Sequence, residues 1–125
     1  MFDKAAASVD AVKAERADIG FFAIDPARSE GLRFTAPYVL IEGSYLVRDG
    51  SELQDNAQVD EAGHRIAVGA GSAYDLFLTR EIHQAELVRV QGAQAVLSAL
   101  RAGQVDVAAS IRQLLETEAL SLIHI

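Results

Sequence analysis

The second half of the chain alternates short apolar runs with segments of helical periodicity. The apolar runs are 65–68, 86–90 and 105–109, and their length and Val, Ile and Ala content are typical of buried strands. In the two intervals between them, apolar residues recur every three or four positions: Tyr74, Phe77 and Leu78, then Ala93, Val96, Leu97 and Leu100. Strand, helix, strand, helix, strand in this order implies parallel strands joined by right-handed crossovers. The pattern therefore predicts an α/β fold with a mainly parallel sheet.

The first half shows a less regular order of elements. Residues 3–14 have the spacing of an amphipathic helix, and 18–24 form an apolar run that predicts a buried parallel strand. Residues 25–28 begin with Asp and Pro, which predicts an N-capped single helical turn. Residues 38–47 are rich in β-forming residues, with an interruption at a glycine, and 48–63 are polar and predict a loop or weak helix.

Composition excludes several classes of function. The chain has 125 residues, half of them apolar and 23% charged, which fits one globular domain or a piece of one. Eleven basic against eighteen acidic residues give a net charge of −7, so we expect no nucleic-acid partner. No apolar run has the length of a membrane span, so we expect no direct membrane insertion. The chain has no cysteine, which excludes disulfides and thiolate sites.

Arg28 is the first candidate functional residue. A cation in the first turn of a helix is disfavoured by the helix dipole, so its presence suggests a role. A guanidinium beside the free amides of a helix start can bind a carboxylate with two hydrogen bonds. The alternative is a surface arginine that pairs with Glu30 or Asp25.

The sequence Gly69-Ala70-Gly71-Ser72 is the second candidate, because it joins a predicted strand to a predicted helix. Glycines allow a ligand to approach the backbone, and the start of the helix attracts negative charge. No lysine precedes Ser72, so this is not a P-loop, and Tyr74 occupies the third glycine position of a dinucleotide fingerprint. The alternative is a tight turn in which Ser72 caps the helix.

Other chemistry has weaker support. The histidines at positions 64, 83 and 124 lack the spacing of metal ligands, so we expect no metal and no cofactor. Asp75 and Glu81 are expected to be solvated helix charges rather than an acid–base pair. The aromatic side chains are expected mostly in the core: Phe21, Phe22, Tyr38, Tyr45, Tyr74 and Phe77.

Three segments together resemble the solute-binding proteins of family 3, the extracellular receptors of polar amino-acid ABC importers. The first is ADIGFFAIDPARSEGLRFTAPYVLIEGSYLVRDGS, in which Arg28 matches the arginine of a Thr-x-x-Arg pattern in the family. Phe34, Thr35, Pro37 and Tyr38 then match its pattern Phe-Ser/Thr-x-Pro-Tyr. The second and third are RIAVGAGSAYDLFL and ALRAGQVDVAAS. The resemblance covers nearly all of residues 2–118.

The resemblance implies a periplasmic binding protein fold of type II, in which a hinge of two strands joins two α/β lobes. Residues 1–44 would be the C-terminal part of lobe 1, 45–50 a hinge strand, and 51–119 an incomplete lobe 2. We then expect an internal piece of a periplasmic protein, with the signal peptide outside it. Residues 120–125 resemble the translation of a sequencing adapter, although a natural terminal element is the alternative.

By resemblance, Arg28 would bind the carboxylate of the solute. The other implied contacts are Phe21 and Ala23 from lobe 1 and Gly71, Ser72 and Ala73 from lobe 2. Three positions depart from the pattern of the family: Asp25 replaces a threonine, Ala23 replaces a serine or threonine, and Ile111 stands where many receptors have an aspartate for the ammonium group. A carboxylate-bearing solute other than an α-amino acid is therefore plausible.

The resemblance implies a binding protein and not an enzyme. It would capture a small anionic or zwitterionic solute by closure of its lobes and present it to the permease of an ABC transporter. Two alternatives remain open on this fold. One is the ligand-sensing domain of a membrane signalling protein or transcription regulator, and the other is an enzyme of the dehydratase type.

Overall fold

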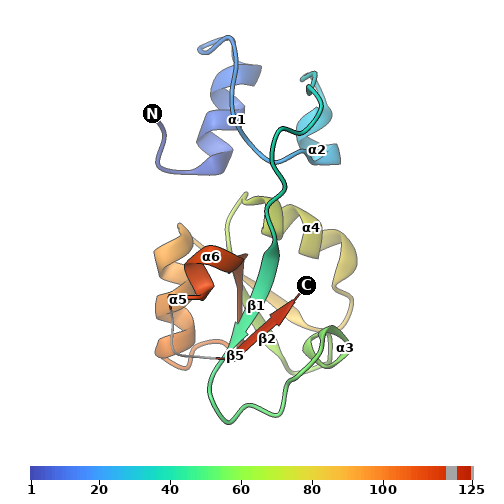
Figure 1. Ribbon diagram of the computed structural model, residues 1–125, viewed down its shortest axis with the longest axis vertical. Helices are drawn as coiled ribbons and strands as arrows, with labels where there is room; N and C mark the ends of the chain where they lie inside the picture. The colour runs from blue at the N-terminus through green and yellow to red at the C-terminus, as the bar shows by residue number, and fades with distance from the viewer. Residues whose placement is uncertain (118–120, 125) are drawn as a thin grey trace.

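The computed structural model describes residues 1–117 and 121–124. Its helices and strands follow the expected order closely from residue 43 onward (Figure 1). In chain order the elements are α1 (Ala5–Lys13), α2 (Pro26–Ser29), β1 (Gly43–Val47), α3 (Asn56–Val59), β2 (Arg65–Gly69), α4 (Ala73–Glu81), β3 (Glu86–Val90), α5 (Ala93–Arg101), β4 (Val107–Ile111), α6 (Arg112–Leu115) and β5 (Ser121–His124).

The strands form one mixed sheet in the order β3-β2-β4-β1-β5. β2 pairs in parallel with both β3 and β4, with Ala67 opposite Val88 on one side and Ala108 on the other. This confirms the parallel arrangement expected for the alternating second half. β1 adds an antiparallel neighbour to β4, and β5 lies antiparallel to β1. The alternating segments therefore form the parallel part of the sheet, and β1 extends it from the first half of the chain.

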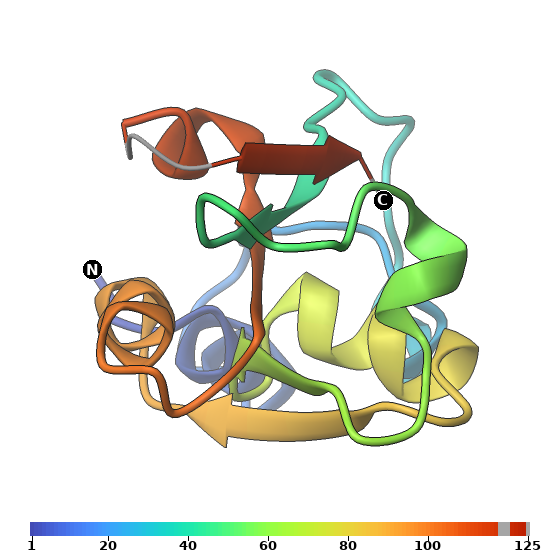
Figure 2. The same ribbon diagram turned by 90° about the horizontal axis from the view of Figure 1, so that it is seen from below.

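Apolar residues cover both faces of the sheet, as a buried sheet requires. Figure 2 shows α3 and α4 on one side and α5 and α6 on the other. The α3 and α4 side has a core of Tyr45, Val47, Val59, Ile66, Val68, Leu78, Val107 and Ala109. The α5 and α6 side has a core of Leu46, Ala67, Val96, Leu97, Ala99, Leu100, Val105, Ala108 and Leu115. Neighbouring residues of β1 alternate between the two cores, as the period of a strand dictates.

The first 42 residues contain α1 and α2, which Figure 1 shows above the sheet, and two long extended segments. The strand predicted at 18–24 is not formed, and 38–42 also lie outside any strand, so β1 begins at Gly43. A strand requires a neighbour to accept and donate its backbone hydrogen bonds. Within the described residues neither segment pairs with a strand, which explains why both expectations are wrong.

Three of the aromatic side chains expected in the core are exposed instead. Phe21 and Tyr38 are 75% and 79% exposed and touch each other edge to face, with ring centroids 6.2 Å apart. Phe77, in α4, is also exposed. Tyr45, by contrast, is buried as expected. The exposed aromatic pair joins the two extended segments that lack strand partners.

No helix among the described residues is long and apolar enough to cross a membrane. The origin expected for residues 120–125 is not tested, since Leu120 and Ile125 lie outside the described residues.

Candidate functional site

The backbone around α2 holds Arg28 in place. Asp25 is the N-cap of this helix, and its Oδ1 accepts a hydrogen bond from the Ala27 amide at 2.9 Å. Pro26 follows as the first helical residue, where its missing N–H costs nothing. The amides of Arg28 and Ser29 both donate to the Asp25 carbonyl. The N-capped turn expected from the sequence is therefore confirmed.

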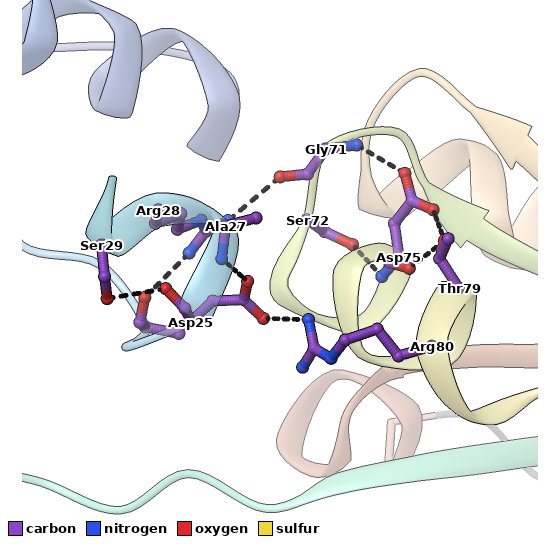
Figure 3. A network of polar contacts seen from close by, with 10 residues as sticks. Asp25, Ala27, Arg28, Ser29, Gly71, Ser72, Asp75, Thr79 and Arg80 are labelled. Carbon is purple, nitrogen blue, oxygen red and sulfur yellow. Dashed lines mark hydrogen bonds and ion pairs between the residues drawn. The ribbon is translucent and has the colours of Figure 1, made fainter. Parts of the chain in front are cut away.

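The guanidinium of Arg28 is buried and points away from α2 toward the glycine turn (Figure 3). Its Nη1 donates to the Ala23 carbonyl at 3.2 Å, and its Nη2 donates to the Gly71 carbonyl at 3.0 Å. Among the described residues no carboxylate forms an ion pair with it, which excludes the expected alternatives of Glu30 and Asp25. Burial lowers the pKa of Arg28, whereas the nearby charge of Asp25 raises it.

The glycine turn between β2 and α4 has a fixed shape. Gly71 has a φ of +70°, a conformation that favours glycine. Ser72 caps α4, as expected, because its Oγ accepts a hydrogen bond from the Asp75 amide at 3.2 Å. The Gly71 amide in turn donates to Asp75 Oδ2 at 2.9 Å.

Asp75 is a structural carboxylate, and the expectation of a solvated helix charge at this position is wrong. It was expected to be solvated, but it is buried, and its Oδ1 accepts a hydrogen bond from Arg89 Nε at 2.8 Å. A carboxylate in the first turn of a helix also complements the helix dipole. Its position four residues after Gly71 is the sequence signal that could have predicted its hydrogen bond with the Gly71 amide.

The first part of the chain contacts the second half at further points. A Cβ atom built on Gly71 would lie 2.8 Å from the Cβ of Ala6, so α1 packs directly against the turn. Asp25 is buried, and its Oδ2 lies 3.0 Å from Nη1 of Arg80 in α4 (Figure 3). Lys4 Nζ donates to Gln91 Oε1 beyond β3. The pair of Asp25 and Arg80 was not predictable from local sequence patterns, because the two residues are 55 positions apart in the chain.

The expected site residues are brought together only in part. Arg28 and Gly71 are in direct contact, and Ala23 contributes its carbonyl. Ser72 uses its hydroxyl and amide within the turn, but no hydrogen bond among the described residues involves the Ala73 amide. Phe21 is exposed. The arrangement presents a buried cation and, at the start of α4, the Ala73 amide without an acceptor among the described residues; both are suited to an anionic group.

Two surface hollows of the structure lie away from Arg28 and Gly71. One, of about 470 Å³, includes Arg48, His64 and Asp106, and the other, of about 420 Å³, includes Tyr45 and Phe77. Neither includes Arg28 or Gly71, because those two residues meet directly. Among the described residues no group of three histidine, aspartate or glutamate side chains is placed to hold a metal ion.

Comparison with known proteins gives structural matches alone. The sequence matches no protein-family model and no curated protein. Solved structures resemble the chain at low identity. An amino-acid ABC transporter substrate-binding protein from Streptococcus pneumoniae, bound to L-arginine, has a TM-score of 0.77 at 17% identity, over 95% of this chain and 52% of that one.

Two further structures support the same fold. The solute receptor for L-cysteine of Neisseria gonorrhoeae has a TM-score of 0.74 at 23% identity, over 88% of this chain and 45% of that one. An ancestral amino-acid-binding protein, a precursor of cyclohexadienyl dehydratase, has a TM-score of 0.77 at 13% identity, over 92% of this chain and 54% of that one.

These likenesses confirm the fold that the sequence resemblance implied. The chain has the α/β fold of the amino-acid-binding proteins of ABC transporters, with a mixed sheet. It spans about half the length of the solved structures that it matches.

Proposed function

We propose that this chain is part of the periplasmic solute-binding component of an ABC importer. It binds a small carboxylate-bearing solute, either a polar amino acid or a related organic anion, by closure of two lobes. The fold supports this proposal, since the structures that resemble the chain include receptors for L-arginine and L-cysteine. The permease of the transporter would be its protein partner.

The lobe boundaries follow from the same proposal. Residues 1–44 belong to lobe 1, 45–50 to the hinge and 51–119 to lobe 2, and 120–125 derive from an adapter. The exposed apolar segments 19–24 and 38–41 would then pair with strands of lobe 1 outside this chain. Their exposure supports the assignment, because large apolar side chains in adjacent extended segments mark a surface that is normally covered.

The observation that carries the proposal is the burial of Arg28 without a carboxylate partner. A buried charge is costly unless it is paired, and here only two backbone carbonyls accept from it among the described residues. A solute carboxylate would supply the missing negative charge. Its charged oxygens would replace the neutral Gly71 carbonyl as acceptors of the hydrogen bonds from Arg28. Charge-assisted hydrogen bonds of this kind contribute about 1.5–3 kcal/mol each.

In the proposed mechanism the lobes separate at the contact between Arg28 and the Gly71 carbonyl. The solute carboxylate enters between Arg28 and the first turn of α4, where the Ala73 amide has no acceptor among the described residues and the helix dipole is favourable. Gly71 and Ser72 contact the solute through the backbone, and Ala23 and Phe21 border it from lobe 1. The lobes then close on the solute by a hinge motion.

Ile111 bears on the class of solute. It lies at the end of β4 opposite Gly43 and has no charge to pair with an ammonium group. By the resemblance, many amino-acid receptors have an aspartate at this position, so recognition of an α-amino group must come from other residues or be absent. An organic anion is therefore a full alternative to an amino acid.

The carboxylates near Arg28 support a binding protein over a dehydratase-type enzyme. Asp25 and Asp75 are buried, and each accepts hydrogen bonds from an arginine and a backbone amide. A general base needs a carboxylate that can take a proton from the substrate. Both carboxylates are already fully engaged in holding the structure.

The proposal is tested by calorimetric titration of the complete protein with the common amino acids and small organic acids. For the solute that binds most tightly, Arg28→Ala is expected to weaken affinity by about tenfold or more, on the magnitude of a charge-assisted hydrogen bond. Arg65→Ala is the matched control, since Arg65 begins β2 at the end remote from Gly71 and its side chain is half-exposed. Unchanged affinity in Arg28→Ala would refute the role of Arg28.

A further inference from the structure

A buried carboxylate beside the proposed anion site poses an electrostatic problem. Asp25 lies three residues before Arg28 in the same short turn, and its charge is felt by the Arg28 guanidinium. An unrestrained Asp25 would pair with Arg28 or repel an incoming carboxylate. Either effect would oppose binding of an anionic solute.

The structure shows how Asp25 is restrained. Oδ1 accepts from the Ala27 amide at 2.9 Å, and Oδ2 accepts from Arg80 Nη1 at 3.0 Å. Both oxygens therefore have partners other than Arg28. Arg80 belongs to α4, which follows the glycine turn, whereas Asp25 and Arg28 belong to the first part of the chain, which faces that turn (Figure 3).

The balance of charge depends on Arg80. With Arg80 in place, the three side chains Asp25, Arg28 and Arg80 sum to one positive charge. Without it, Asp25 and Arg28 sum to zero in a site shielded from water, where charges interact strongly. A solute carboxylate would then have to displace Asp25 from the guanidinium.

We propose that Arg80 is a positioning residue for solute binding: when the lobes are closed, it holds the Asp25 carboxylate and so leaves the Arg28 guanidinium to the bound anion. This inference rests on the proposed function. It assigns a specificity role to a side chain that lies outside the set carried over from the resemblance. It also explains why aspartate is tolerated at position 25, next to the proposed carboxylate site.

The test uses the 125-residue chain labelled with ¹⁵N and titrated with sodium acetate, the smallest probe with the relevant group. Binding is followed at the side-chain N–H signals of Arg28. The variants are Arg80→Gln, Asp25→Asn and the two together. Arg65→Gln is the matched control, because Arg65 also faces a carboxylate and its side chain is similarly exposed.

Arg80→Gln is expected to weaken acetate binding about tenfold, and the added Asp25→Asn is expected to restore it to within about threefold. A purely structural role for Arg80 would leave the double variant as weak as the single one, and that result overturns the inference. Asp25→Asn alone keeps a good N-cap and removes the negative charge beside Arg28, so it should bind acetate at least as tightly as the unmodified chain. A tenfold loss in this variant would also overturn the inference.

A measurement without ligand separates this inference from the proposed function. In Arg80→Gln the Arg28 side-chain signals are expected to shift as Asp25 turns toward them, and Asp25→Asn is expected to reverse that shift. If acetate fails to bind the unmodified chain while this shift occurs, the proposed anion site fails and the restraint of Asp25 stands. If acetate binds and no shift occurs, the inference about Arg80 fails.

Discussion

Gly71→Ala tests whether the first part of the chain rests on the glycine turn as the structure shows. Two separate effects oppose an alanine at this position. The φ of +70° disfavours any L side chain, and the new Cβ would lie 2.8 Å from the Cβ of Ala6. Both atoms are fixed to backbone, so relief requires that α1 move away from the turn.

The two effects can be separated by a control glycine. Gly50 has a φ of +80° and nothing within 4 Å of an added Cβ, so Gly50→Ala measures the backbone effect alone. That effect is about 1–2 kcal/mol. Overpacking at Gly71 adds about 1–3 kcal/mol, which gives about 2–5 kcal/mol for Gly71→Ala.

The assay is urea denaturation of each variant, followed by circular dichroism. Ala6→Gly in the Gly71→Ala background should recover the overpacking part, less about 1 kcal/mol for a glycine within α1. Equal destabilisation by Gly71→Ala and Gly50→Ala would refute the packing of α1 against the turn. So would the absence of any coupling between positions 6 and 71.

Two other predictions concern the core and the exposed segments. Burial, followed by the charge of Asp60, raises the pKa of Tyr45 to about 12 from its ordinary value of 10.0. The neutral phenol therefore stabilises the folded state fully below pH 10, and this contribution is lost as the pH rises toward 12. In urea titrations over that pH range, the free energy of unfolding should fall less steeply for Tyr45→Phe than for the unmodified chain. An identical fall in both proteins would contradict the burial of the phenol. Ile19→Ser with Leu40→Ser should reduce self-association of the 125-residue chain in sedimentation experiments, because both side chains are highly exposed, whereas Phe77→Ser should change it less. Unaltered association in the double variant would show that the two segments do not attract other chains.

The second half of the fold was predictable because its signals are local. Apolar runs and apolar periodicity marked β2, α4, β3 and α5, and Ser72 marked the start of α4. Parallel pairing then followed from the order of elements alone. The first half was less predictable, since 18–24 have the composition of a strand but no partner strand among the described residues.

The candidate site was predictable only where the sequence carried a recognisable turn. Arg28 and Gly71 were both identified, and the structure brings them within hydrogen-bond distance. The role of Asp75 was missed because it depends on the exact shape of the glycine turn, whose Gly71 amide it binds. The role of Arg80 was missed because it depends on a contact with Asp25, which is far away in the sequence. Such roles are set by tertiary packing, which helical periodicity does not encode.

The most direct test of the central claim is a crystal structure of the complete protein with its carboxylate solute. The account predicts solute oxygens about 3 Å from the Arg28 guanidinium and from an amide in the first turn of α4. The hydrogen bond from Arg28 to the Gly71 carbonyl would be replaced by one to the solute. A solute bound elsewhere, with Arg28 still donating to Gly71, would contradict the account.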